Sequence, residues 1–305
     1  MGQFVDGEWK TGWYKSADDG SFQRPPTTFR QRITELEEQR YHLYVSLACP
    51  WAHRTLIARS VLGLQEKISV SVVDWFLDDE GWRFYPQHEG ATEDHLFGYD
   101  HLRHVYKKAD DRYTGRVTVP VLWDRKKGTI VNNESREILR SFSTDLAPWY
   151  ADGAPDLSPE ALRKEIDETL DAIYEPINNG VYKSGFATTQ EAYDKAVTAL
   201  FEALDGWEQH LSKEPFLVGG RFTEADICFF TTLVRFDPVY RTHFKCSLKM
   251  IAEYPALQSY LRKLYAIPGV AETCDFEHIS RHYYESHRGI NPHGIVAKSP
   301  RAFTL

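Results

Sequence analysis

The chain has 305 residues, with 36 Lys and Arg against 44 Asp and Glu, and its formal net charge is −8. This length predicts two domains, each able to bury a core of its own. The negative charge and the lack of a long basic run argue against nucleic acids and anionic membrane surfaces as partners. No apolar run is long enough to span a bilayer.

The four cysteines are few and widely spaced, which indicates a reducing cytoplasm rather than a disulfide framework. They are Cys49, Cys228, Cys246 and Cys274. The N-terminus is acidic and lacks a hydrophobic signal region. We therefore predict a cytoplasmic protein.

Residues 1–40 carry Gly, Asp, Trp and a Pro25-Pro26 pair without clear periodicity. We predict an extended arm that packs locally through Trp9, Trp13 and Phe22.

Cys49 lies at a predicted strand-to-helix junction. Residues 41–46 are aromatic and β-branched, as in a strand, and apolar residues recur at helical spacing from residue 56 until Gly63. Pro50 suits the first helical position, where its missing N–H costs nothing. Cys49 then faces the positive end of the helix dipole, which stabilises a thiolate, the nucleophilic form of cysteine.

Most free cysteines are small buried hydrophobic residues, so the position of Cys49 has to carry the functional interpretation. A proline beside a cysteine at a helix start is typical of a redox site. A dithiol site would need a second cysteine at position 52, where the chain has Ala52. If Cys49 is reactive, its second thiol must come from outside the motif, which points to a small thiol cosubstrate.

Residues 67–74 predict a second strand, parallel to the first through a right-handed crossover. Residues 75–115 interrupt the pattern with many aromatic residues, and we predict a partly structured insertion near an active site. The insertion contains His88, His95, His101 and His104 without a cysteine, at a spacing that matches no zinc pattern. We predict no metal site.

Residues 116–124 predict a strand preceded by the Val119-Pro120 bond, since proline marks an edge or a strand start. This bond is a candidate cis peptide bond. A turn at 126–128 leads to a hairpin partner at 129–131. A helix follows from 132–135 to about residue 142, and its polar first residues are ordinary caps when taken singly.

After Pro155 the pattern becomes helical, with an irregular tail from His287. Helices are predicted from residue 158 to about 173 and over 188–211, 251–265 and 269–281. Asp226 resembles a catalytic carboxylate, but Thr223 stands three residues before it at a helix start. We assign the pair to a capping box and therefore to folding.

The order of these elements resembles a cytosolic glutathione transferase. The resemblance implies the following fold class for this chain: an α/β thioredoxin-like N-terminal domain followed by an all-α C-terminal domain. The resemblance implies an arm over 1–40, a thioredoxin-like glutathione-binding domain over 41–145 with an insertion at about 75–115, and an all-helical substrate domain over 158–305.

Finer motifs in both domains resemble the glutathionyl-hydroquinone reductases, the Xi class of glutathione transferases. The likeness covers about residues 40–300 and departs at 297–300, where the family usually has Pro and Gly. The motifs lie at residues 46–54, 116–123, 133–135, 180–187, 235–240, 243–246, 283, 287 and 290–296.

The resemblance implies a glutathione site. The backbone of Val119 would pair with the cysteinyl unit like an added strand. Ser135 and nearby N–H groups would take the γ-glutamyl carboxylate, and Glu134 would face its ammonium group. Arg116 would bind the glycyl carboxylate, and Trp82 would pack on glutathione and donate its indole N–H.

The resemblance also implies that Tyr182, Tyr240 and Tyr283 line a pocket for the aromatic ring of a hydroquinone. Without it, these residues are ordinary edges of a helical core. The implied catalytic residues are Cys49, Tyr182 and Tyr283. Glutathione is then a cosubstrate with no bound cofactor or metal, aromatic glutathione conjugates are the partners, and the protein is a homodimer.

The implied reaction has two steps. Cys49 takes the glutathione sulfur from a glutathionyl-hydroquinone, and a second glutathione then resolves the mixed disulfide. One alternative is an Omega-like thiol transferase or dehydroascorbate reductase, which needs the cysteine but not the tyrosines. Another is a non-catalytic binding module of transferase fold, in which the thiol of Cys49 would titrate normally or be inaccessible.

Overall fold

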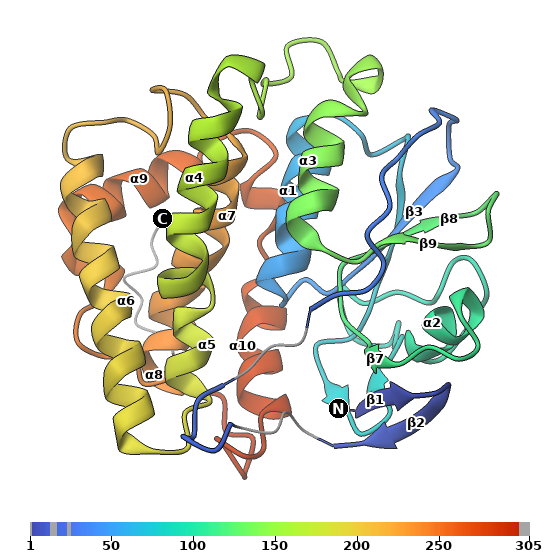
Figure 1. Ribbon diagram of the computed structural model, residues 1–305, viewed down its shortest axis with the longest axis horizontal. Helices are drawn as coiled ribbons and strands as arrows, with labels where there is room; N and C mark the ends of the chain where they lie inside the picture. The colour runs from blue at the N-terminus through green and yellow to red at the C-terminus, as the bar shows by residue number, and fades with distance from the viewer. Residues whose placement is uncertain (1, 13–16, 23–25, 299–305) are drawn as a thin grey trace. The chain divides into compact units, whose positions relative to one another are not determined.

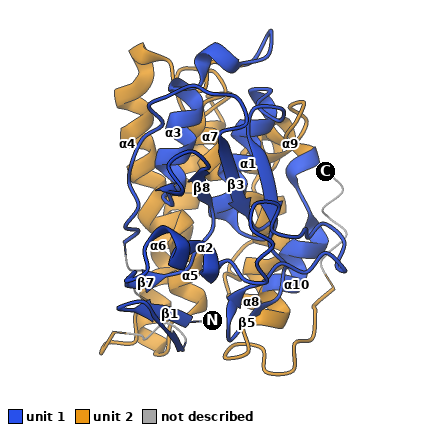
Figure 2. Ribbon diagram, turned by 90° about the vertical axis from the view of Figure 1, so that its right-hand side faces the viewer, with its two compact units in different colours: residues 1–13, 25–154, 272–282 blue, residues 14–24, 155–271, 283–305 orange. Residues whose placement is uncertain are grey.

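The computed structural model describes residues 2–12, 17–22 and 26–298, shown in Figure 1. Trp13 and the end of the 297–300 departure lie outside these residues. The chain forms two compact units, coloured in Figure 2. Unit 1 comprises Met1–Trp13, Pro25–Ala154 and Glu272–His282, and unit 2 comprises Tyr14–Arg24, Pro155–Ala271 and Tyr283–Leu305.

A four-stranded sheet with the order β4-β3-β8-β9 forms the centre of unit 1. Its strands are β3 (Tyr41–Val45), β4 (Ser69–Val72), β8 (Val121–Asp124) and β9 (Thr129–Asn132). Every residue of β3 is buried, as expected for a central strand, and β3 pairs in parallel with β4 and antiparallel with β8. The predicted strand–helix–strand unit is confirmed.

Two helices of unit 1 pack against each other beside this sheet: α1 (Pro50–Val61) and α3 (Ser135–Thr144) (Figure 1). The Val119-Pro120 peptide bond is cis, as predicted. Strand β8 begins directly after Pro120, as expected for a strand preceded by the Val119-Pro120 bond, so the range 116–124 given for this strand is too long only at its start. Proline has no N–H to give to a sheet ladder, so strand pairing resumes at the next residue.

The arm begins with regular structure that the sequence analysis missed. Strands β1 (Gly2–Val5) and β2 (Glu8–Thr11) form a hairpin, and β7 (Gly115–Arg116) pairs with the other edge of β1. Asp6 and Gly7 form the turn with φ of 49° and 76°, which is the Asp-Gly signature of a tight hairpin.

Two of the aromatic residues expected to pack the arm locally, Trp9 and Phe22, differ from each other in their contacts. Trp9 lies edge-on to Phe4, with ring centroids 5.2 Å apart, so its packing is local as predicted. Phe22 instead contacts Tyr182 and Phe186 of unit 2, at centroid distances of 6.5 and 5.3 Å. The expectation of local packing is wrong for Phe22, whose ring packs against aromatic rings far along the chain, an arrangement that aromatic side chains favour.

The insertion contains three short elements: β5 (Leu77–Asp78), β6 (Gly81–Trp82) and α2 (Arg103–Ala109). Its base is held by the fully buried carboxylate of Asp74. Nε of Arg83 donates to this carboxylate at 2.7 Å, and Nδ1 of His88 lies 2.9 Å from it. The His88 ring also stacks on Trp75 with centroids 4.0 Å apart, so His88 has a structural role.

Unit 2 is helical, as predicted. Its helices are α4 (Arg163–Ile173), α5 (Gly180–Gly185), α6 (Gln190–Leu211), α7 (Glu224–Arg235), α8 (Arg241–His243) and α9 (Pro255–Tyr265). None of the described helices of the chain has the length and apolar character needed to cross a membrane.

The predicted helix over 269–281 is misplaced. Helix α10 spans Phe276–Ser286, and the boundary between the units falls within it. The side chain of Asp275 accepts a hydrogen bond from the N–H of His278 at 2.8 Å. This capping interaction starts the helix at residue 276, and apolar spacing alone did not reveal it.

Asp226 has the folding role that the sequence indicated. Its carboxylate is fully buried and accepts hydrogen bonds from the N–H of Thr223 at 2.8 Å and from the N–H of Leu217 at 3.0 Å. The hydroxyl of Tyr260 donates to it at 2.7 Å. Burial raises the pKa of Asp226, and the three donors offset part of that effect.

His42 on β3 makes the stability of unit 1 sensitive to acid. Its ring is buried, with Nδ1 2.7 Å from Oγ of Ser69 and Nε2 2.9 Å from Oγ of Ser71. Burial lowers the pKa of His42 to about 3, below the ordinary value of 6.5. A depressed pKa gives stability that is present above about pH 6.5 and is lost as the pH falls toward 3.

We expect the free energy of unfolding to fall by about 2 kcal/mol between pH 6.5 and pH 5 because of His42 alone. Urea unfolding of the protein and of His42→Gln at both pH values measures this, and the variant should lack this part of the slope. His293→Gln, at an exposed tail position, is the control and should keep the full slope. Equal slopes in the protein and His42→Gln would contradict the prediction.

Candidate active site

Cys49 is the N-cap residue of α1, with φ of −77° and ψ of 121°, and Pro50 follows as the first helical residue. Its carbonyl accepts the hydrogen bond from the N–H of His53 at 2.9 Å, which opens the helix. The side chain is 9% exposed. The predicted junction is therefore present, with the thiol at the positive end of the helix dipole.

The sulfur of Cys49 lies beside the cis peptide bond. Its thiol donates a hydrogen bond to the carbonyl of Val119, with Sγ 3.6 Å from the oxygen. Val119 is 70 residues away in the sequence and is buried. The structure thus brings together the predicted nucleophile and the residue predicted to pair with the cysteinyl unit of glutathione.

The N-terminus of α3 presents the two residues expected to bind the γ-glutamyl end. Glu134 is the N-cap, and its carboxylate accepts from the N–H of Arg136 at 3.3 Å and from the hydroxyl of Thr27 at 3.2 Å. Ser135 is the first helical residue and is buried. A helix start of this kind binds carboxylates through its N–H groups.

Arg54 is a residue of this region that the sequence analysis did not single out. It lies on α1, is 3% exposed, and its guanidinium donates to the hydroxyl of Ser135 at 3.3 Å. The same guanidinium lies over the ring of Trp51 at 4.5 Å. A cation therefore joins the helix of Cys49 to the helix of Ser135. Its position five residues after Cys49, within the same motif, was the available signal.

Arg116 and Trp82 make their described contacts with other segments of unit 1. The guanidinium of Arg116 donates to the backbone carbonyls of Gly2 and Gly12 at 3.3 and 3.0 Å, which ties β7 to the arm. Trp82 is 6% exposed and stacks on His282 with centroids 5.0 Å apart. These contacts are structural, and the glutathione roles of both residues stay predictions.

The three predicted tyrosines of unit 2 meet at their hydroxyl groups. Tyr182 lies on α5, Tyr240 ends a π-helical turn (Phe236–Tyr240), and Tyr283 lies on α10. The hydroxyl of Tyr283 is 2.6 Å from that of Tyr182 and 2.9 Å from that of Tyr240. Tyr283 therefore connects the three phenols in one hydrogen-bonded chain.

Burial dominates the electrostatics of this cluster. Tyr283 is 1% exposed, and burial together with the neighbouring phenols raises its pKa well above the ordinary value of 10. Arg235 acts in the opposite direction. Tyr283 is therefore protonated at neutral pH and can donate a hydrogen bond or a proton.

An aromatic layer supports the cluster. The ring of Phe244 stacks on Tyr240 with centroids 5.5 Å apart, and His287 stacks on Phe244 at 5.8 Å. Gly185 lies so close to Phe244 that a Cβ there would meet the ring at 2.1 Å. The missing side chain at Gly185 thus lets Phe244 pack beside Tyr240 and Tyr182.

Comparisons with known proteins identify the family of the chain. Residues 48–144 match the family model of the glutathione S-transferase N-terminal domain, and residues 190–263 match that of the C-terminal domain. The first match contains Cys49, Val119, Glu134 and Ser135, and the second contains Tyr240.

Individual relatives match almost the whole chain. Glutathionyl-hydroquinone reductase YqjG of Escherichia coli is 50% identical over 98% of this chain and 95% of its own. PcpF of Sphingobium chlorophenolicum, with the same enzyme name, is 46% identical over 98% of this chain and 96% of its own.

Solved structures give the same result. The Xi glutathione transferase of Phanerochaete chrysosporium has a TM-score of 0.92 at 50% identity, covering 94% of this chain and 95% of that one. Glutathione-bound YqjG has a TM-score of 0.87 at 51% identity, covering 98% and 96%. The chain therefore belongs to the glutathione transferases, in the Xi class of glutathionyl-hydroquinone reductases.

Proposed function

We propose that this protein reduces glutathionyl-hydroquinones to hydroquinones in the cytoplasm, with glutathione as cosubstrate and no bound cofactor. One observation carries the proposal. Cys49 caps α1 without a cysteine at position 52, in a chain 50% identical to a protein named glutathionyl-hydroquinone reductase. A single thiol in this position suits an exchange in which glutathione supplies the second sulfur.

Glutathione binds in unit 1 in this proposal. Its cysteinyl backbone pairs with Val119, which brings the glutathione sulfur to the thiol of Cys49. Its γ-glutamyl carboxylate lies at the N-terminus of α3 with Ser135, whose hydroxyl is already polarised by Arg54. Glu134 receives the ammonium group as a charge-assisted hydrogen-bond acceptor.

Arg116 and Trp82 complete the proposed glutathione site. Arg116 takes the glycyl carboxylate, and Trp82 packs on the tripeptide. Both residues would have to bind glutathione while keeping the structural contacts that they already make. We therefore expect smaller effects from their substitution than from changes at Ser135.

The first chemical step is attack of the Cys49 thiolate on the glutathione sulfur of the conjugate. A sulfur–sulfur bond forms, the sulfur–carbon bond breaks, and the electron pair of that bond leaves with the ring carbon. A tyrosine delivers a proton to this carbon, which releases the hydroquinone. Cys49 is then a mixed disulfide with glutathione.

The second step regenerates the enzyme. The thiolate of a second glutathione attacks the mixed disulfide, oxidised glutathione leaves, and the Cys49 thiolate is restored. The two electrons that reduce the carbon thus come from two glutathione sulfurs. With Ala52 in place of a second cysteine, the neighbouring position offers no thiol to replace glutathione in this step.

The tyrosine cluster of unit 2 binds and protonates the hydroquinone ring in this proposal. Phenols stack on an aromatic ring and hydrogen-bond its hydroxyls. The chain of hydroxyls through Tyr283 can replace a donated proton and spread the resulting negative charge over neighbouring donors. Tyr182 and Tyr283 are the candidate donors, and the enzyme acts as a homodimer.

A single-turnover experiment tests the function. The reduced protein is mixed with one equivalent of a glutathionyl-hydroquinone in the absence of free glutathione. We expect one equivalent of hydroquinone, and a gain of one glutathione on the peptide that contains Cys49, by mass spectrometry. Added glutathione should then release oxidised glutathione. Hydroquinone release without this adduct, or no release at all, would contradict the proposal.

A further inference from the structure

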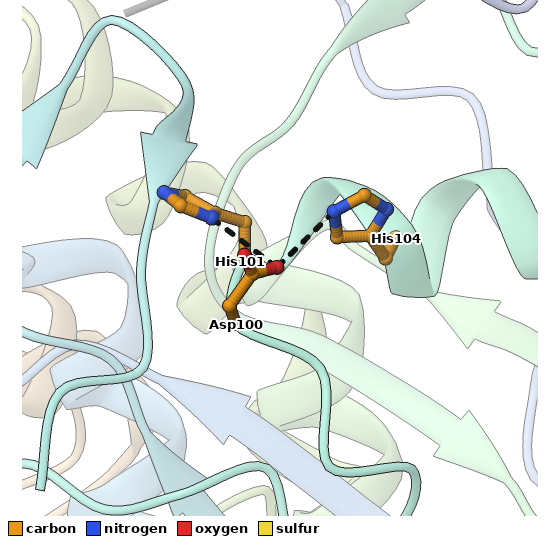
Figure 3. Close-up of side chains that lie close together, drawn as sticks. All are labelled: Asp100, His101 and His104. Carbon is orange, nitrogen blue, oxygen red and sulfur yellow. Dashed lines mark ion pairs between the residues drawn. The ribbon is translucent and has the colours of Figure 1, made fainter.

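A second group of reactive side chains lies in the insertion of unit 1. Asp100, His101 and His104 each offer one ligand atom, and these atoms lie within 4.8 Å of one another (Figure 3). Asp100 and His101 precede α2, and His104 lies in its first turn. The side chains of Asp100 and His104 are 76% and 41% exposed, so an ion can reach the group from solvent.

The spacing of the three atoms suits a tetrahedral metal ion. Oδ1 of Asp100 lies 3.4 Å from Nδ1 of His101 and 3.2 Å from Nε2 of His104. Zinc bonds imidazole nitrogen and carboxylate oxygen at about 2.0–2.2 Å, so the edges of its tetrahedron are roughly 3.3–3.6 Å. Two of the three edges are therefore nearly in place.

His101 is oriented as a metal ligand commonly is. Its Nε2 lies 3.4 Å from a carboxylate oxygen of Asp78 on β5, while its Nδ1 is turned toward Asp100. That Nδ1 atom is buried and has no hydrogen-bond partner among the described residues. A carboxylate behind a histidine fixes the ring and raises the basicity of its other nitrogen.

The charges around the group suit a cation. Asp78 and Asp100 bring two carboxylates, and the adjacent cation Arg103 forms an ion pair with Glu80.

The other histidines of the insertion are occupied elsewhere. Nδ1 of His88 lies at the buried carboxylate of Asp74, and Nδ1 of His95 donates to the carbonyl of Val70 at 2.9 Å. Of the four histidines in the insertion, only His101 and His104 therefore lie together, with the carboxylate of Asp100 between them. The sequence spacing alone predicted no metal, because Asp78 and the role of Asp100 are visible only in three dimensions.

We propose that Asp100, His101 and His104 bind a zinc ion, with Asp78 as the positioning residue behind His101 and water as the fourth ligand. The ion would link the first turn of α2 to the end of β5 through Asp78. Its expected effect is to stabilise the insertion, and it takes no part in the thiol chemistry of Cys49.

Calorimetric titration with Zn²⁺ tests this site. Thiolates also bind zinc, so the parent protein for the titration carries Cys49→Ser and Cys274→Ser, which removes the two cysteines that are not fully buried. It is first freed of metal with a chelator. We expect one equivalent of Zn²⁺ to bind with a Kd of about 100 µM or tighter. Bound zinc should also raise Tm, because it binds the folded chain.

Variants in this parent identify the ligands. His101→Ala and His104→Ala should each weaken binding at least about 10-fold, and Asp78→Asn should weaken it about 10-fold while leaving the stoichiometry unchanged. His95→Ala removes a histidine of the same insertion and should change nothing. The His104 side chain is substantially exposed, so its replacement should not unfold the chain. An unchanged Tm in the absence of metal would show that this variant is folded.

Two outcomes would overturn the proposal. One is the absence of saturable Zn²⁺ binding in the parent protein. The other is binding of equal strength in the parent, His101→Ala and His104→Ala. Reductase activity is measured separately in the chain with its natural cysteines, so failure of the metal site does not bear on the proposed reaction.

Discussion

Replacement of Cys49 by serine is expected to lower the reductase activity at least roughly a thousandfold, to a level set by the uncatalysed reaction. A serine hydroxyl stays protonated at neutral pH and is a poor nucleophile toward sulfur. The helix N-terminus that stabilises a thiolate cannot compensate for this difference. Hydroquinone release from a glutathionyl-hydroquinone in the presence of glutathione, followed by chromatography, measures the effect.

Cys274→Ser is the matched control for this experiment. Cys274 is the other cysteine that is not fully buried, and its sulfur lies 3.8 Å from Nε2 of His53. Its loss should leave the rate within about twofold of the natural protein. If Cys49→Ser still turned over the conjugate and Cys274→Ser did not, the assigned nucleophile would be wrong.

Replacement of Tyr283 by phenylalanine is expected to lower kcat for a glutathionyl-hydroquinone about 100-fold, which is the usual contribution of a general acid. The variant keeps the ring and its packing but removes the hydroxyl that connects Tyr182 with Tyr240. In the proposed mechanism, the leaving ring carbon then lacks its proton donor. The rate at saturating conjugate, measured at several pH values, tests this expectation.

A small glutathione mixed disulfide provides the discriminating second substrate. Its leaving group is a thiolate, which needs no proton on carbon, so Tyr283→Phe should reduce it at the natural rate. An equal loss with both substrates would point to a structural role for the hydroxyl. If Tyr283→Phe lost no activity with either substrate, the Omega-like thiol transferase would be favoured over the quinol reductase.

Tyr254→Phe is the control for loss of a buried phenol. Tyr254 is 1% exposed, and its hydroxyl donates to Asp205 at 2.9 Å, outside the tyrosine cluster. Its replacement should lower stability while changing the ratio of the two rates by less than about twofold. A ratio that shifts as in Tyr283→Phe would mean that the assay reports general destabilisation.

Much of the fold could be predicted because local chemistry decides it. The strand before Cys49, the helix after it and the capping carboxylate of Asp226 follow from residues within a few positions of one another. Two elements were placed less well because their local signals were overlooked. Helix α10 starts at an Asp275 cap rather than with the apolar pattern, and the β1–β2 hairpin depends on a two-residue turn in an otherwise irregular arm.

The residues of the candidate site also differ in whether a local sequence signal identifies them. Each tyrosine taken alone is an ordinary residue of an amphipathic helix, and the resemblance to the Xi class was needed to single it out. Tyr182 and Tyr240 stand 101 and 43 residues from Tyr283 in the sequence, yet their hydroxyls meet. Arg54 belongs to the motif of Cys49, but its contact with Ser135 spans 81 residues and cannot be read from that motif.

The amino-acid sequence by itself determined that Cys49 precedes a helix whose first residue is Pro50 and that position 52 holds no second thiol. These properties depend on neighbouring residues, so the chain order contains them. Only the tertiary structure decided that Val119 meets the sulfur, that three phenols share hydrogen bonds, and that Asp78 stands behind His101. Such contacts join segments far apart in the chain, and the packing of the core, rather than any local preference, sets their distances.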